Sequence, residues 1–278
     1  MNAARLAAAA DAVTAAGLLL QRMTRPRRMP LGEAQAALLA QAERLAFTVE
    51  GATLAGHAWG GTGPGEVRPR VLLAHGWESR AAAWHAFVPV LAAAGWQVVA
   101  LDFPAHGDSP GAATDVVAMG KALVTVGSRL GRVDALVAHS LGSPASLYAF
   151  AHGLDVAASV HLSGPASLVR ALERAERHAR LPPPAAALFR ARFEDRLGHP
   201  AATMDLERLA HGLRHPALLL HDPEDPEVPY AESEALAAAW PQALLEPAPG
   251  AGHRRIIEDA ALARRAAAFL GARLAARA

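Results

Sequence analysis

Short apolar runs alternate with segments of helical spacing along most of the chain. Each run is continuous rather than alternating, which is typical of strands that are buried on both faces. The predicted strands are Val71–Ala74, Gln97–Leu101, Val133–Ala138, Ser159–Leu162, Ala217–Leu220 and Ala243–Glu246. The predicted helices are Ala81–Ala94, Val116–Leu130, Ser143–His152, Ala231–Trp240 and Ile256–Arg273. This alternation predicts an α/β fold with a mostly parallel central sheet and helices on both faces.

The first part of the chain departs from this alternation. Residues 1–44 have a helical pattern with a break around Pro26 and Pro30, which predicts an N-terminal helical extension. Two β-like runs then flank a glycine between Phe47 and Trp59, as in a hairpin, and the Gly/Pro-rich stretch Gly60–Pro69 has the composition of a loop.

A second departure lies late in the chain. Residues 165–215 are rich in Arg, Glu and Ala, contain the run Pro182-Pro183-Pro184 and have helical spacing. We interpret them as a small helical cap inserted above the carboxyl edge of the sheet, not as a separate domain. Residues 45–164 and 216–278 then form the core.

Composition narrows the function classes. The 278 residues include 52% hydrophobic and 19% charged residues, as in a globular protein with a large core. A net charge of +1 argues against a nucleic-acid partner, because proteins that bind nucleic acids usually have a strong excess of basic residues. The absence of cysteine excludes disulfides and thiolate ligands, and the simplest expectation is a cytoplasmic location.

The apolar stretch Leu6–Leu20 does not fit a signal peptide. Asp11 interrupts it, only Arg5 precedes it and no small-residue cleavage site is evident. The stretch is also too short to span a bilayer. We interpret it as a packed or peripheral amphipathic helix and expect no membrane association; a homo-oligomer is left open.

One predicted strand ends in a chemically informative turn. The run Val133–Ala138 leads into His139-Ser140-Leu141-Gly142, and a helix-compatible segment follows. A strand that turns sharply into a helix can hold a serine at its tip with the hydroxyl exposed. Helix amides behind that tip stabilise developing negative charge. Ser140 is therefore a candidate nucleophile, although a serine also serves as an ordinary helix N-cap.

Other polar groups follow neighbouring strands, whose carboxyl ends form the ligand-binding edge of such sheets. These segments are His75-Gly76-Trp77, Asp102 to Ser109, His221 to Pro229 and Gly250 to His253. Together with the serine turn they resemble the α/β-hydrolase superfamily, from about Phe47 to the C-terminus, in the chain order serine, acid, histidine. The resemblance implies an α/β-hydrolase fold with Ser140 as nucleophile, Asp225 as acid and His253 as general base. It also implies an oxyanion hole formed by the backbone N–H groups of Trp77 and Leu141.

The turn that holds the nucleophile in this superfamily, called the nucleophile elbow, usually has the sequence G-x-S-x-G. Here Ala138 replaces the first glycine; alanine is the smallest change, so we expect the elbow to survive.

Asp222 and Glu224 compete with Asp225 as the acid, but the spacing to Val228-Pro229 favours Asp225. The other histidines at strand ends, His75, His106, His139 and His221, are expected to bond loop backbone, and no metal site is expected.

The expected activity is hydrolysis of a carboxylic ester through an acyl-enzyme, without a cofactor and with a small acyl ester as substrate. A thioesterase, lactonase or acyltransferase could use the same triad, and a non-catalytic binding protein could keep the fold. An aspartate nucleophile, as in dehalogenase relatives, is excluded by Ser140. Candidates for the substrate pocket, which could equally be packing residues, are Trp84, Phe189, Phe193 and Met204.

Overall fold

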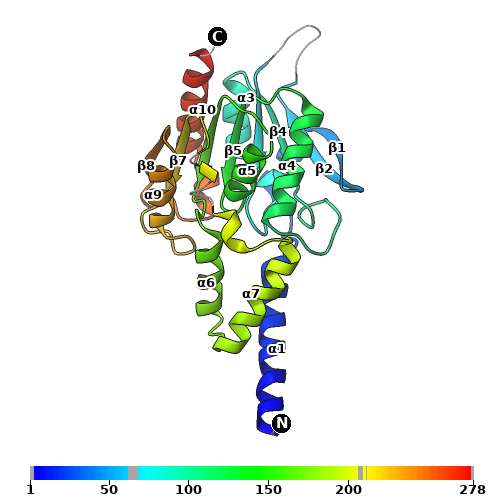
Figure 1. Ribbon diagram of the computed structural model, residues 1–278. Helices are drawn as coiled ribbons and strands as arrows, with labels where there is room; N and C mark the ends of the chain where they lie inside the picture. Colours follow the sequence, from blue (N-terminus) through cyan, green and yellow to red (C-terminus); the bar gives the residue numbers. More distant parts are fainter. Residues whose placement is uncertain (1–2, 62–67, 206–208, 211, 277–278) are drawn as a thin grey trace.

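A computed structural model describes residues 3–61, 68–205, 209–210 and 212–276 (Figure 1). Most of the predicted loop Gly60–Pro69 and four positions of the predicted cap, residues 206–208 and 211, lie outside the described residues. Within the described part of the chain, no helix combines the length and apolar character needed to cross a membrane.

The core is a single sheet with the order β1-β2-β4-β3-β5-β6-β7-β8. The first two strands form the predicted hairpin, β2 pairs antiparallel with β4, and all later neighbours are parallel. This confirms the predicted mostly parallel α/β fold. The strands are β1 (Glu43–Val49), β2 (Ala52–Trp59), β3 (Arg70–Ala74), β4 (Gln97–Leu101), β5 (Ala135–His139), β6 (Ala158–Leu162), β7 (Ala217–His221) and β8 (Ala243–Pro247).

Helices cover both faces of this sheet, as predicted, with α4 and α5 on one face and α3 and α10 on the other (Figure 1). The helices of the described chain are α1 (Ala3–Thr24), α2 (Glu33–Leu39), α3 (Phe87–Ala93), α4 (Val116–Leu130), α5 (Gly142–Ala151), α6 (Leu168–His178), α7 (Pro183–Leu197), α9 (Tyr230–Ala239) and α10 (Ala260–Ala275). Short 3-10 helices are η1 (Ala81–Trp84), η2 (Ala201–Met204) and η3 (Arg255–Glu258).

Successive residues of each central strand enter opposite cores. In β3, Leu72 and Ala74 pack with α4 and α5, whereas Val71 and Leu73 pack with α3 and α10. This follows from the side-chain period of two in a strand. It explains why the central strands read as continuous apolar runs, since neither face is exposed to water.

Two predicted helices are each divided in the structure. The segment predicted as Ala81–Ala94 consists of η1 and α3, because Pro89 has no N–H and its ring excludes a helical carbonyl four residues earlier. Pro89 instead lies in the first turn of α3. The segment predicted as Ile256–Arg273 consists of η3 and α10, and Asp259 begins α10 by accepting the amides of Ala261 and Leu262.

The cap consists of α6, α7 and η2 at the carboxyl edge of the sheet, and α1 lies beside α7 (Figure 1). Over residues 11–24, the helix α1 buries Ala16 and Leu19 but leaves Leu18 63% exposed, so this part of the helix packs along one side. Glu232 of α9, which is buried, accepts hydrogen bonds from Arg170 and Arg174 of α6 and so fixes the cap to the core.

Candidate active site

Ser140 occupies a sharp turn between β5 and α5. Its φ angle is 48°, in the left-handed region that a non-glycine residue rarely adopts. The Ser140 amide donates to the Leu162 carbonyl of β6 at 2.9 Å, and the Ser143 amide donates to the Ser140 carbonyl at 2.9 Å. These bonds hold the strained residue at the end of β5, where its side chain projects from the sheet edge.

The turn is possible because neighbouring backbone approaches it closely. A Cβ atom on Gly142 would lie 2.3 Å from the Ala74 carbonyl oxygen of β3. A Cβ atom on Gly76 would lie 2.8 Å from the Ser140 Cβ atom. Ala138, in contrast, is fully buried opposite Ala74 in the β3–β5 register, and its methyl group belongs to the core. The structure therefore accommodates alanine at the first elbow position.

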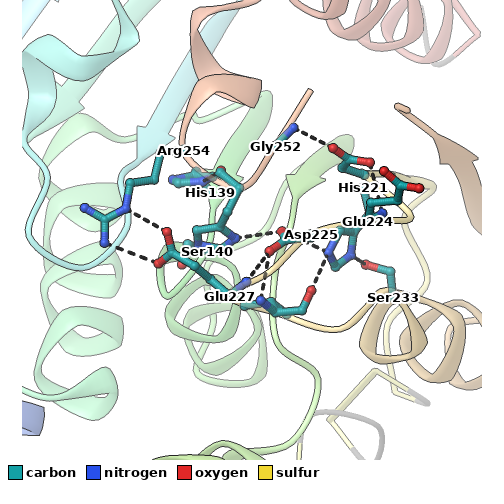
Figure 2. Close-up of polar contacts among 12 residues, drawn as sticks. His139, Ser140, His221, Glu224, Asp225, Glu227, Ser233, Gly252 and Arg254 are labelled. Atoms are coloured by element: carbon teal, nitrogen blue, oxygen red, sulfur yellow. Dashed lines mark hydrogen bonds and ion pairs between the residues drawn. The ribbon is translucent and has the colours of Figure 1, made fainter. Parts of the chain in front are cut away.

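The structure brings together the three residues predicted to form the triad, of which Figure 2 labels Ser140 and Asp225. His253 Nε2 lies 3.0 Å from Ser140 Oγ, and His253 Nδ1 lies 2.8 Å from Asp225 Oδ2. The carboxylate can only accept, so Nδ1 carries the hydrogen and the Nε2 lone pair faces the serine hydroxyl. The arrangement can therefore remove a proton from Ser140.

Asp225 is surrounded by donors. Its side chain is fully buried, and its Oδ1 atom accepts the amides of Glu227 and Val228 at 2.8 and 2.9 Å. His221 Nε2 lies 3.2 Å from Oδ2. Burial raises the pKa of Asp225, but the hydrogen bonds from His221, His253 and Val228 outweigh it and hold the pKa well below its usual range. Asp225 is therefore an ionised carboxylate in a water-excluded position.

The competing acids have other roles. Asp222 accepts the Glu224 amide at 3.0 Å and the Gly252 amide at 2.7 Å, and these two bonds lower its pKa. Asp222 thus closes a turn and also anchors the loop that precedes His253, which the sequence did not indicate. Within the described chain, neither Asp222 nor Glu224 bonds the His253 ring.

The other strand-end histidines bond loop backbone, in agreement with their predicted structural role. His75 Nδ1 lies 2.8 Å from the Gly76 carbonyl, and His106 Nε2 accepts the Glu78 amide at 3.1 Å. His139 Nε2 donates to the His253 carbonyl at 2.8 Å. This bond connects the elbow to the loop Gly250–His253, here called the histidine loop. Burial lowers the pKa of His139 to about 3 and that of His106 to about 4, so both rings are neutral near pH 7.

The backbone amides predicted to form an oxyanion hole flank the serine. Leu141 follows Ser140 directly, and Trp77 follows Gly76, which lies against the Ser140 side chain. Among the described residues, neither amide donates a hydrogen bond to another protein group. Both N–H groups are thus available to a ligand near Ser140 Oγ.

A small apolar cavity lies beside the elbow, between the core and the cap. It measures about 20 Å³, enough for a group slightly larger than one water molecule. Of the predicted pocket residues, Met204 lies in its wall. The lining consists of Val116, Leu141, Pro144, Pro165, Ser167, Leu168, Ala171 and Met204.

The other three predicted pocket residues do not line this cavity, which corrects the sequence expectation. Trp84 is fully buried on the opposite face of the sheet, with its ring centroid 5.2 Å from that of Phe87. Phe189 and Phe193 pack against each other, with centroids 5.9 Å apart, inside the core that joins the cap to the body. Their large apolar surfaces are consumed by helix packing, which sequence pattern cannot distinguish from a pocket wall.

A candidate cation cluster lies away from Ser140. Ligand atoms of His57, Asp102 and Asp108 lie within 4.8 Å of one another, and neither ring nitrogen of His57 has a hydrogen-bond partner among the described residues. However, both oxygens of Asp102 accept backbone amides, and the Arg80 guanidinium already lies 2.8 Å from Asp108. A cation there would face this guanidinium, so we assign no metal to the cluster.

Comparison with known proteins agrees with the fold. Residues 69–181 match the family model described as the alpha/beta hydrolase fold. No curated protein matches the chain in sequence. The predicted resemblance to the α/β-hydrolase superfamily is confirmed.

Solved structures with this fold cover nearly the whole chain. Est1E from Butyrivibrio proteoclasticus, with ferulic acid bound, is 18% identical, with a TM-score of 0.69, over 83% of this chain and 99% of that chain. The esterase Pf2001 from Pyrococcus furiosus is 19% identical, with a TM-score of 0.67, over 90% and 98%. A bacterial membrane phospholipase A is 22% identical, with a TM-score of 0.65, over 86% and 92%. At these identities the likeness concerns the fold.

The close approach at the elbow leads to a stability prediction. Gly142→Ala places a methyl group against the backbone of β3, which cannot move without disturbing the sheet, so we expect a loss of about 2 kcal/mol or more in unfolding free energy. Gly271→Ala in α10 is the matched control, because a Cβ atom there meets nothing within 4 Å and alanine favours a helix. Urea unfolding of both variants measures the difference; equal stability would contradict the tight elbow.

Proposed function

We propose that this chain, which has the α/β-hydrolase fold, is a serine hydrolase that cleaves carboxylic esters through an acyl-enzyme. The observation that carries the proposal is the chain of hydrogen bonds from Ser140 Oγ through His253 to Asp225. A serine hydroxyl is a weak nucleophile until a positioned base takes its proton. An ordinary helix N-cap, the alternative role of Ser140, requires neither a strained backbone at the serine nor a buried, ionised Asp225.

The proposed reaction has two halves. Ser140 Oγ attacks the acyl carbonyl while His253 Nε2 takes the hydroxyl proton, and the N–H groups of Trp77 and Leu141 stabilise the oxyanion. Collapse breaks the ester C–O bond, and His253 returns the proton to the departing alcohol. Water then attacks the acyl-enzyme by the same route, which releases the acid and restores Ser140. Asp225 stabilises the imidazolium that forms in each half, and no cofactor takes part.

The small cavity beside Leu141 is the proposed acyl site. Its lining is apolar, as an acyl chain requires, and its small volume of about 20 Å³ favours the shortest chains. The name of one similar structure supports an ester substrate, since Pf2001 is described as an esterase. The cap places Leu168, Ala171 and Met204 over this site, where they determine how long a chain fits.

The decisive test of the proposal is the nucleophile. Ser140→Ala is expected to lower kcat for a p-nitrophenyl acetate ester on the order of 10⁴-fold or more, because triad members act as a unit. Wild-type protein should also react with a fluorophosphonate probe at Ser140, located by peptide mass spectrometry. Unfolding measured in parallel controls for loss of structure. Turnover above a tenth of wild type in the pure variant would contradict the assignment.

The acid is tested by a matched pair. Asp225→Asn is expected to lower kcat about 10⁴-fold, as the same change does in serine proteases, because asparagine cannot stabilise the imidazolium and selects the wrong tautomer. Asp222→Asn retains an oxygen that can accept the Gly252 amide, so we expect a loss of less than about tenfold. Steady-state kinetics of both variants decide between them. A larger effect at Asp222 would show that the acid is misassigned.

The acyl site is tested by chain length. Met204→Ala enlarges the cavity, so we expect the ratio of kcat/KM for butyrate over acetate esters to rise about tenfold or more, since one methylene contributes roughly 1–3 kcal/mol. Phe189→Ala is the control, because it truncates a buried side chain outside the lining. We expect it to lower stability but leave the ratio unchanged. If only Phe189→Ala changed the ratio, the acyl site would lie elsewhere.

A further inference from the structure

Residues 25–32, here called the N-terminal arm, connect α1 to α2 and cross the loops at the carboxyl edge of the sheet. Arg27 of the arm binds Glu78 through several hydrogen bonds. Its Nη2 atom lies 2.6 Å from Oε2, its Nε atom donates to both carboxylate oxygens at 3.0 Å, and its backbone amide donates to Oε1 at 3.2 Å. Several hydrogen bonds from one planar guanidinium fix the orientation of a carboxylate and also neutralise its charge.

Glu78 belongs to the segment that would stabilise the oxyanion. It follows Trp77 directly, and its own φ angle is 52°, a conformation that glutamate does not adopt without support. Its amide donates to His106 Nε2 at 3.1 Å, and its side chain is only 12% exposed. The loop 75–78 is thus held from two sides: by His106 through the backbone, and by Arg27 through the side chain.

The rest of the arm is docked firmly enough to act as a support. Arg28 Nη2 donates to the carbonyls of Ser109 at 2.7 Å and Gly111 at 3.2 Å, and Arg28 Nη1 also reaches the Gly107 carbonyl. The Thr114 amide donates to the Thr24 carbonyl at the end of α1 at 2.8 Å. The arm is therefore fixed to the loop after β4, and Arg27 reaches Glu78 from a rigid base.

The loop that carries His253 also influences Glu78 electrostatically. Arg254, next to His253, forms an ion pair with Glu227 at 2.8 Å (Figure 2). Hydrogen bonds from Arg27 lower the pKa of Glu78, and the charges of Arg27 and Arg254 add to this effect. Glu78 therefore stays ionised near neutral pH, and its main partner is the arm.

We infer that the Arg27–Glu78 pair positions the Trp77 amide for oxyanion stabilisation, which makes the N-terminal arm part of the catalytic apparatus. The inference rests on the proposed function. Neither residue touches substrate; both act through the backbone of the loop 75–78. An oxyanion donor acts mainly in the transition state. Loss of the pair should therefore lower kcat and leave KM nearly unchanged.

The test uses Arg27→Met, which keeps the aliphatic stem and removes the charge, and Glu78→Gln. For a short-chain neutral ester we expect kcat to fall about 10- to 100-fold with KM within twofold, since a complete loss of one oxyanion donor costs about 10²–10³-fold. The inhibition constant of a trifluoromethyl ketone, which forms a tetrahedral oxyanion on the serine, should rise by the same factor as kcat/KM falls.

Three further variants make the test specific. Lys121→Met breaks an exposed ion pair with Glu50 far from the site and should leave kinetics unchanged. Arg27→Lys keeps the charge and should recover part of the loss, and the swap Arg27→Glu with Glu78→Arg should recover activity relative to either single change. Melting temperatures and the fraction of fluorophosphonate-reactive enzyme correct for unfolded protein.

The outcomes separate this inference from the proposed function. If wild-type protein neither turns over esters nor reacts with the fluorophosphonate, the proposed function fails and the inference with it. If wild type is active but Arg27→Met matches Lys121→Met, only the inference is overturned. A raised KM with unchanged kcat would also overturn it, because Arg27 would then bind substrate. A kcat loss that disappears after correction for unfolded enzyme would assign the pair to stability alone.

Discussion

The site depends on how closely β3 and β5 approach each other where both strands end. The backbone of Gly142 lies directly against the carbonyl of Ala74, and Gly76 leaves no room for a side chain beside Ser140. This packing forces the backbone of Ser140 into a positive φ angle, and the strain is sustained by the sheet on either side. The side chain of Ser140 is thereby held in place by the ends of two central strands.

A second constraint is the burial of a charge. Asp225 is removed from water, yet hydrogen bonds from two histidine rings and two backbone amides keep it ionised. The hydrogen bonds of His221 are structural. Its Nε2 atom faces Asp225 and the Val228 carbonyl, and its Nδ1 atom lies 2.7 Å from Ser233 Oγ. The histidine loop is fixed separately, by Asp222 at Gly252 and by His139 at the His253 carbonyl. Asp225 and the loop that carries His253 are thus held by separate sets of hydrogen bonds.

Much of the fold could be predicted because its signals are local. Continuous apolar runs indicated β3 to β8, and Asp115 begins α4 at the predicted residue by accepting the Ala118 amide. The errors have equally local causes, since Pro89 and Asp259 each divide a helix that composition alone would extend. The sequence left two roles open for Trp84, Phe189 and Phe193, because a large apolar side chain has the same pattern in a core as in a pocket.

The sequence by itself determined the order of the elements, the elbow and the candidate triad, because strand period and motif spacing are properties of neighbouring residues. Only the tertiary structure decided which carboxylate reaches His253, since Asp222, Glu224 and Asp225 differ by the direction in which one turn points them. It also revealed the contact between Arg27 and Glu78 across 51 positions of sequence. Contacts of this kind depend on where the sheet places distant loops, and no local pattern of residues records that.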